Sequence, residues 1–127
     1  MKGHGETILV VEDDKELRET VSDLLRFLGY RIFTAPDGED GVRLFQEHRW
    51  EIDLVLLDAV MPRKNGFEAY KEMDLMRPGL PSLFVTGYNA ARGRNDIEDA
   101  GSPGVLHKPY SIEMLSRIIR RTLDGKH

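Results

Sequence analysis

The chain has 127 residues, so we expect one domain over residues 1–127 with a core from about 6 to 124. It contains no cysteine, which excludes disulfides, thiolate metal sites and cysteine nucleophiles. The formal net charge of −4 argues against direct nucleic-acid binding, although Arg120 and Arg121 could form a local basic patch. No apolar run approaches the roughly 18 residues of a membrane span, and the polar first five residues do not resemble a signal peptide. We therefore expect a cytoplasmic protein with no membrane partner.

The first strand-like run, residues 7–11, ends on three acids, Glu12, Asp13 and Asp14. Asp14 is a suitable N-cap for the helix that follows, because its carboxylate can accept hydrogen bonds from the first turn. Apolar residues then recur at helical spacing as far as Gly29, which is placed to end the helix. The chain therefore begins with a strand that delivers acids to the loop before a helix.

A second strand is expected over residues 31–35, and Asp37 with Gly38 then turns the chain into a second helix. The apolar positions of this helix are Val42, Leu44 and Phe45. We expect Trp50 to pack beneath it.

Asp58 ends the third strand-like run, residues 53–58, and a loop containing Pro62 and Gly66 follows at once. A short buried strand that stops on a carboxylate and enters such a loop places that carboxylate at the C-terminal edge of a sheet. In open α/β sheets, ligands bind at this edge. Asp58 is therefore the first candidate for a functional residue.

The remaining segments continue the alternation of strands and helices. We expect a third helix from near Phe67, a fourth strand over residues 81–86 and a fifth over residues 104–107. Residues 89–100 offer few core positions and would form only a short helix. Ser111 is placed to cap the last helix.

Repeated strand–helix units with short links indicate an α/β fold with a parallel sheet covered by helices on both faces. We expect the flavodoxin-like, doubly wound, five-stranded order 2-1-3-4-5 with five helices. Strands one and three are then neighbours, roughly 4.8 Å apart. Asp13 and Asp58 would meet at the switch point of the sheet, where a crevice opens.

Carboxylates this close require a compensating charge. At about 5 Å and an effective dielectric near 20, each pair repels by roughly 3 kcal/mol. Oxygen ligands in small number suit Mg²⁺, and no histidine lies beside these acids in the sequence. Thr86 and Lys108 end the fourth and fifth strands at the same edge, where a hydroxyl and an ammonium group could surround a tetrahedral dianion on Asp58.

The ordered set Glu12-Asp13, Asp58, Thr86 and Lys108-Pro109 resembles the signature of receiver (CheY-like) domains of two-component response regulators, over nearly the whole chain. The resemblance implies that Asp58 is the phosphoacceptor. It implies that Glu12, Asp13, Asp58 and the backbone carbonyl of Val60 bind Mg²⁺, and that Thr86 and Lys108 contact the phosphoryl group.

The same resemblance implies a phosphorelay in which a sensor histidine kinase or a histidine phosphotransfer domain donates the phosphoryl group. The product would switch the face formed by the fourth helix, fifth strand and fifth helix toward an unknown output partner, with at most slow self-dephosphorylation and no enzymatic turnover. Val105 stands where the family often has an aromatic switch residue, so Tyr88 or Tyr110 would have to replace it. Both a stand-alone receiver and the C-terminal receiver of a hybrid sensor histidine kinase fit the sequence.

Other interpretations remain open at this stage. A phosphatase-like enzyme using Asp58 as nucleophile would need a second acid two residues later, where Val60 stands. A flavin- or nucleotide-binding relative would need a Gly-rich loop where the acids follow the first strand. A pseudo-receiver that only binds partners would not need the complete set of phosphorylation residues.

Overall fold

The computed structural model describes residues 3–59, 65–86, 105–107 and 111–125. Within these residues, five strands form one parallel sheet in the order β2-β1-β3-β4-β5, as the sequence predicted. The strands are β1 (Thr7–Val11), β2 (Arg31–Ala35), β3 (Leu54–Asp58), β4 (Ser82–Thr86) and β5 (Val105–His107). The helices are α1 (Lys15–Phe27), α2 (Gly38–His48), α3 (Gly66–Met76) and α5 (Ile112–Leu123). The helix expected over residues 89–100 lies outside the described residues.

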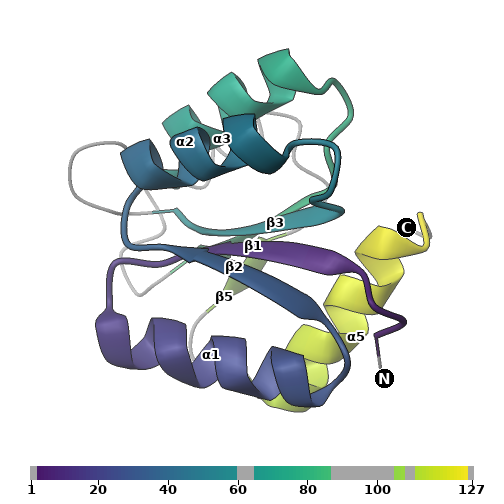
Figure 1. Cartoon of the computed structure of the whole chain (residues 1–127). Coiled ribbons are helices and arrows are strands. Elements are labelled where there is room, and N and C mark those ends of the chain that lie inside the picture. The colour runs from purple at the N-terminus through teal and green to yellow at the C-terminus, as the bar shows by residue number, and fades with distance from the viewer. Residues whose placement is uncertain (1–2, 60–64, 87–104, 108–110, 126–127) are drawn as a thin grey trace.

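The sheet is the middle of three layers, with α2 and α3 on one face and α1 and α5 on the other (Figure 1). Successive side chains of a strand point to opposite faces, so each central strand supplies both cores. Leu9 and Leu57 contribute to the core beneath α2 and α3, whereas Ile8 and Leu56 contribute to the core beneath α1 and α5. This is why the central strands are apolar at nearly every position.

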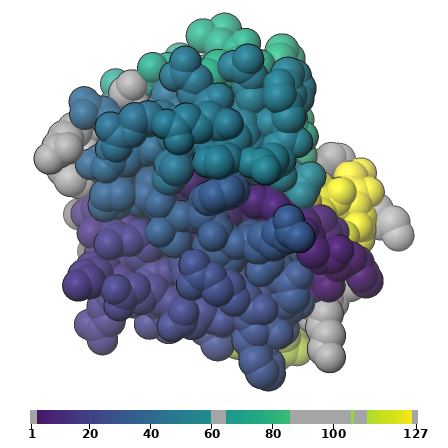
Figure 2. All heavy atoms as spheres, in the orientation of Figure 1, coloured from purple at the N-terminus to yellow at the C-terminus, as the bar shows by residue number. Residues whose placement is uncertain are grey.

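The edge strand β2 differs from the central strands. It lies between the two helical layers, and side chains of α1, β2 and α2 together form the face seen in Figure 2. Arg31 and Thr34 of this strand are exposed, whereas Ala35 at its end is buried. The polar residues of β2 therefore face solvent, which is how natural proteins protect a sheet edge.

Three helix boundaries confirm the sequence predictions. The Asp14 carboxylate accepts a hydrogen bond from the backbone N–H of Leu17 at 3.1 Å, and the Ser111 hydroxyl accepts one from Met114 at 3.0 Å. Gly29 follows α1 with a φ of 98°, a left-handed conformation that glycine adopts without a Cβ penalty.

One prediction about a helix needs correction. Trp50 does not pack beneath α2: it is 76% exposed, and the Arg49 guanidinium lies 5.7 Å from its ring centroid. Phe45 and its neighbours already fill the core face of α2, so a residue beyond the end of the helix has no place there. The prediction of a third helix from near Phe67 is confirmed: α3 begins at Gly66, where Asn65 and Glu68 form a capping box.

Arg120 is part of a buried ion-pair network and not of a basic surface patch. Its guanidinium donates to the carboxylates of Glu6, at 2.6 Å, and Asp124, at 2.8 Å. Arg120 is 8% exposed, and the bond to Glu6 lowers the pKa of that carboxyl to about 2. The network ties α5 to the segment before β1, so the N-terminal segment lies beside the end of α5 (Figure 1).

Candidate functional site

Two neighbouring strands bring three carboxylates together at the carboxyl edge of the sheet. β1 and β3 pair in parallel with Val11 opposite Leu57, so Glu12 and Asp58 follow at the next position of each strand. Carboxylate oxygens of Glu12, Asp13 and Asp58 all lie within 4.8 Å of one another. The predicted convergence of these acids is therefore present in the structure.

The three acids differ in their exposure. Glu12 is 6% exposed and Asp58 is 7% exposed, whereas Asp13 is exposed. A small space of about 10 Å³ lies beside the two buried acids, and Val10, Val21, Leu56 and Val85 line it. Apolar walls exclude water, so charges at this site interact more strongly than they would on an open surface.

Three hydrogen bonds hold Glu12 in the acidic turn after β1. The N–H of Glu12 donates to the carbonyl of Ala35 at 3.1 Å, which continues the pairing with β2. The Glu12 carbonyl accepts from Nη1 of Arg18 at 2.8 Å, and the N–H of Asp14 donates to Oε2 of Glu12 at 3.2 Å. Glu12 is therefore fixed through its N–H, its carbonyl and its side chain.

Arg18 was missed by sequence reasoning. It lies near the start of α1, where the helix dipole disfavours a positive charge. A basic residue at such a position, soon after an acidic cluster, was the sequence signal that Arg18 contacts the acidic turn.

The donor set fits a small hard cation. Carboxylate oxygens are the ligands that Mg²⁺ prefers, and it is commonly held by one or two carboxylates with water completing the shell. The group found here contains only carboxylates among the described residues, without histidine. The arrangement also concentrates negative charge at one point, so a bound cation would remove repulsion as well as gain ligands.

The other predicted site residues are only partly described. Thr86 ends β4 opposite His107 of β5, which places the backbone of both strand ends at the same edge of the sheet as Asp58. For Thr86 and Val105 the structure describes the backbone alone, and Val60 and Lys108 lie outside the described residues.

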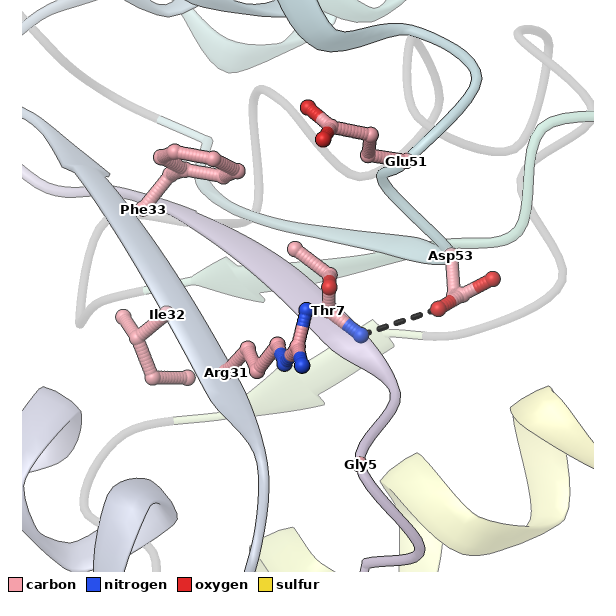
Figure 3. A pocket seen from close by; sticks show the side chains of 7 residues that line it. All are labelled: Gly5, Thr7, Arg31, Ile32, Phe33, Glu51 and Asp53. Atoms are coloured by element: carbon pink, nitrogen blue, oxygen red, sulfur yellow. Dashed lines mark hydrogen bonds between the residues drawn. The ribbon is translucent and has the colours of Figure 1, made fainter.

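A second hollow, of about 330 Å³, lies at the opposite edge of the sheet (Figure 3). Thr7 and Arg31, at the starts of β1 and β2, line it with Asp53. Oδ2 of Asp53 accepts a hydrogen bond from the N–H of Thr7 at 2.9 Å, so this carboxylate joins the entry of β3 to β1. Ligands of parallel sheets bind at the carboxyl ends of the strands, so this hollow is not the candidate site.

In the parts of the chain that the structure describes, each helix is too short or too polar to cross a bilayer.

Comparison with known proteins identifies one family. Residues 8–120 match the model of the response regulator receiver domain. A probable transcriptional regulatory protein of Mycobacterium tuberculosis, TcrX, is 36% identical over 124 residues, which cover 94% of this chain and 52% of that protein. The chain therefore spans about half the length of this curated relative.

Solved structures agree. A response regulator receiver domain protein from Clostridium thermocellum has a TM-score of 0.89 at 26% identity, covering 94% of this chain and 95% of that one. The chemotaxis protein CheY4 of Vibrio cholerae has a TM-score of 0.85 at 28% identity, covering 93% of this chain and 98% of that one.

Proposed function

The chain belongs to the response regulator receiver domains of two-component systems, and we propose that Asp58 is the residue that accepts the phosphoryl group. The observation that carries this proposal is the cluster of Glu12, Asp13 and Asp58 at the carboxyl edge of the sheet. Asp58 is the member of the cluster that ends a central strand, and its backbone is held there by pairing with Val85 of β4.

The proposed reaction is a nucleophilic displacement at phosphorus. A carboxylate oxygen of Asp58 attacks the phosphorus of a phosphohistidine, a P–O bond forms, and the P–N bond breaks. The histidine nitrogen leaves and takes up a proton, and Asp58 becomes an acyl phosphate. Hydrolysis later breaks the new P–O bond and releases inorganic phosphate, so the carboxylate is regenerated.

We propose that Glu12, Asp13, Asp58 and the carbonyl of Val60 hold Mg²⁺. When bound, the cation neutralises charge on the transferring oxygens and lowers the barrier to attack by an anionic nucleophile. The protein itself positions the reacting carboxylate: Glu12 is fixed by its three hydrogen bonds and Asp58 by the sheet. Correct placement of groups is the main contribution a protein makes to phosphoryl transfer.

Thr86 and Lys108 complete the proposed site. Thr86 ends β4, which pairs with β3, and Lys108 directly follows β5, which pairs with β4. A hydroxyl and an ammonium group at these positions would donate to phosphoryl oxygens that Asp58 alone would repel.

The proposed partners follow from this chemistry. A sensor histidine kinase or a histidine phosphotransfer domain donates the phosphoryl group in the cytoplasm, and the face of the fourth helix, β5 and α5 transmits the change to an output partner. We propose no turnover beyond slow self-dephosphorylation.

Incubation with acetyl phosphate and Mg²⁺, followed by intact-mass measurement, tests the proposal. The parent protein should gain the mass of one phosphoryl group, and Asp58→Asn should gain none. Asp23→Asn changes an exposed acid of α1 that lies outside the cluster and should behave as the parent. A parent protein that stays unmodified, or an Asp58→Asn variant modified to the same extent, contradicts the proposal.

A further inference from the structure

Gly66, the first residue of α3, lies against the backbone of Asp58. A Cβ atom at Gly66 would overlap the carbonyl oxygen of Asp58 and would lie 3.0 Å from its carbonyl carbon and 3.2 Å from the Cα of Ala59. Real Cβ atoms essentially never come as close to another atom as this Cβ would come to the Asp58 carbonyl oxygen. A side chain at position 66 therefore requires a backbone shift. Only glycine permits this approach.

The approach is fixed from both sides. The N–H of Gly66 donates to the carbonyl of Ala59 at 3.3 Å, and the N–H of Ala59 donates to the carbonyl of Val85 at 2.9 Å. Asn65 and Glu68 form the capping box that sets the start of α3, with bonds of 2.8 and 3.2 Å. The end of β3 is therefore held between β4 and the first turn of α3.

Another buried glycine shows why the kind of neighbour matters. A Cβ at Gly41 of α2 would meet Cγ2 of Val11 at 2.9 Å, which is also short. That neighbour is a side-chain methyl group, whereas the neighbour of Gly66 is the backbone of Asp58 itself. Addition of a methyl group at position 66 therefore moves Asp58, because its main chain cannot rotate away.

We propose that Gly66 is a positioning residue for the acidic site: its contact with the Asp58 backbone sets where the Asp58 carboxylate stands relative to Glu12 and Asp13. The inference rests on the proposed function for its catalytic consequence, since Asp58 is there the attacking group. A displacement of about 1 Å at a reacting group can cost on the order of a hundredfold in rate. The same displacement separates Asp58 from the other carboxylates and weakens cation binding.

The test compares Gly66→Ala with Ala69→Gly. Ala69 is fully buried in the same helix, so its replacement destabilises α3 through a lost methyl group and added backbone freedom, and it adds no atom beside Asp58. Mg²⁺ affinity is measured by titration calorimetry, and the rate of phosphorylation by acetyl phosphate is measured at saturating Mg²⁺. Both are measured at a temperature at which circular dichroism shows each variant to be folded.

We expect Gly66→Ala to bind Mg²⁺ at least several-fold more weakly and to be phosphorylated at least about tenfold more slowly than the parent. Ala69→Gly should keep both values within about twofold of the parent, although its unfolding midpoint falls. A folded Gly66→Ala protein with the affinity and rate of the parent overturns the inference, and so does an Ala69→Gly protein with equal losses.

If Gly66→Ala does not fold, Asn65→Ala decides the question, with Ser111→Ala as its control. Each removes one N-cap, at a cost of about 1 kcal/mol, but only Asn65 holds the helix start that touches Asp58. Weaker Mg²⁺ binding in Asn65→Ala alone supports the inference, and equal binding in both variants overturns it. The Mg²⁺ titrations stand even if the parent is never phosphorylated, a result that would overturn the proposed function instead.

Discussion

Glu12 and Asp58 stand side by side because Val11 and Leu57, the residues before them, are paired across β1 and β3. Strand register therefore places two buried acids together, and the chain continues from Glu12 to a third at Asp13. Repulsion among these acids is a cost of the folded state that a cation would relieve.

Mg²⁺ should therefore stabilise the protein. A ligand that binds only the native state raises the free energy of unfolding by about 2.7 kcal/mol at a concentration 100 times its Kd. Asp13→Asn removes one of the repelling acids, so without Mg²⁺ this variant should melt at a higher temperature than the parent. It should also need more Mg²⁺ for the same stabilisation. Thermal melts over a Mg²⁺ series check both effects, with Asp23→Asn as the control, and an Asp13→Asn response identical to that of the parent would refute the role of Asp13.

The Glu6–Arg120 ion pair predicts a pH-dependent loss of stability. The bond to Arg120 lowers the pKa of Glu6 from its ordinary value of 4.5 to about 2. The ionised Glu6 therefore stabilises the folded state fully above about pH 4.5, and this contribution is lost as the pH falls toward 2.

Glu6→Gln should consequently lower the free energy of unfolding by about 2 kcal/mol at pH 7, once partial exposure of the carboxylate is allowed for. The difference from the parent should shrink below pH 4.5. Urea unfolding at several pH values measures it. Glu113→Gln is the control, because Glu113 pairs with Arg117 at 3.4 Å with both side chains exposed. A Glu6→Gln difference that stays constant with pH would argue against this linkage.

Trp50 and Phe45 should respond very differently to truncation. Phe45 is fully buried on the core face of α2, so Phe45→Ala should cost about 3–5 kcal/mol. Trp50 is mostly exposed, so Trp50→Ala should stay within about 0.5 kcal/mol of the parent. Chemical unfolding of both variants makes the comparison, and a large loss in Trp50→Ala would mean that its ring is packed after all.

The resemblance to receiver domains implies that residues 60 and 88 flank the point where water attacks the phosphoryl group. Val60 and the ring of Tyr88 cannot orient that water, so the phosphoryl group should be long-lived. Val60→Asn supplies an amide that can, so dephosphorylation should accelerate by up to about tenfold. Decay of the phosphorylated protein is followed by intact mass after acetyl phosphate is removed, with Val60→Ala to separate the effect of size from that of polarity. Equal lifetimes in the parent and Val60→Asn would exclude this explanation.

The predictions that the structure confirms rest mainly on residue types at helix ends and strand ends. Asp14 and Ser111 cap helices through bonds that span three residues, and Gly29 ends α1 through its own backbone conformation. The acidic cluster was predictable because strand ends and a standard parallel topology are enough to place Asp58 near Asp13. Each of these features depends on residue type together with short spacing or a standard topology.

The features that were missed depend on contacts that residue type and short spacing do not reveal. The Arg120 guanidinium can be buried because it pairs with the carboxylate of Glu6, which is 114 positions away in the sequence. Gly66 was interpreted as part of a loop, since nothing local shows that its helix would begin against the Asp58 carbonyl. Trp50 is apolar, and composition alone does not decide whether an apolar ring after a helix reaches the core.

The most direct measurement locates the acyl phosphate. Borohydride reduces a phosphorylated aspartate to homoserine, which tandem mass spectrometry of peptides assigns to a single position. After treatment with acetyl phosphate and Mg²⁺, homoserine should appear at position 58 and at neither Asp13 nor Asp14. Homoserine at Asp13, or its absence everywhere in protein that carries a phosphoryl group, would contradict Asp58 as the acceptor.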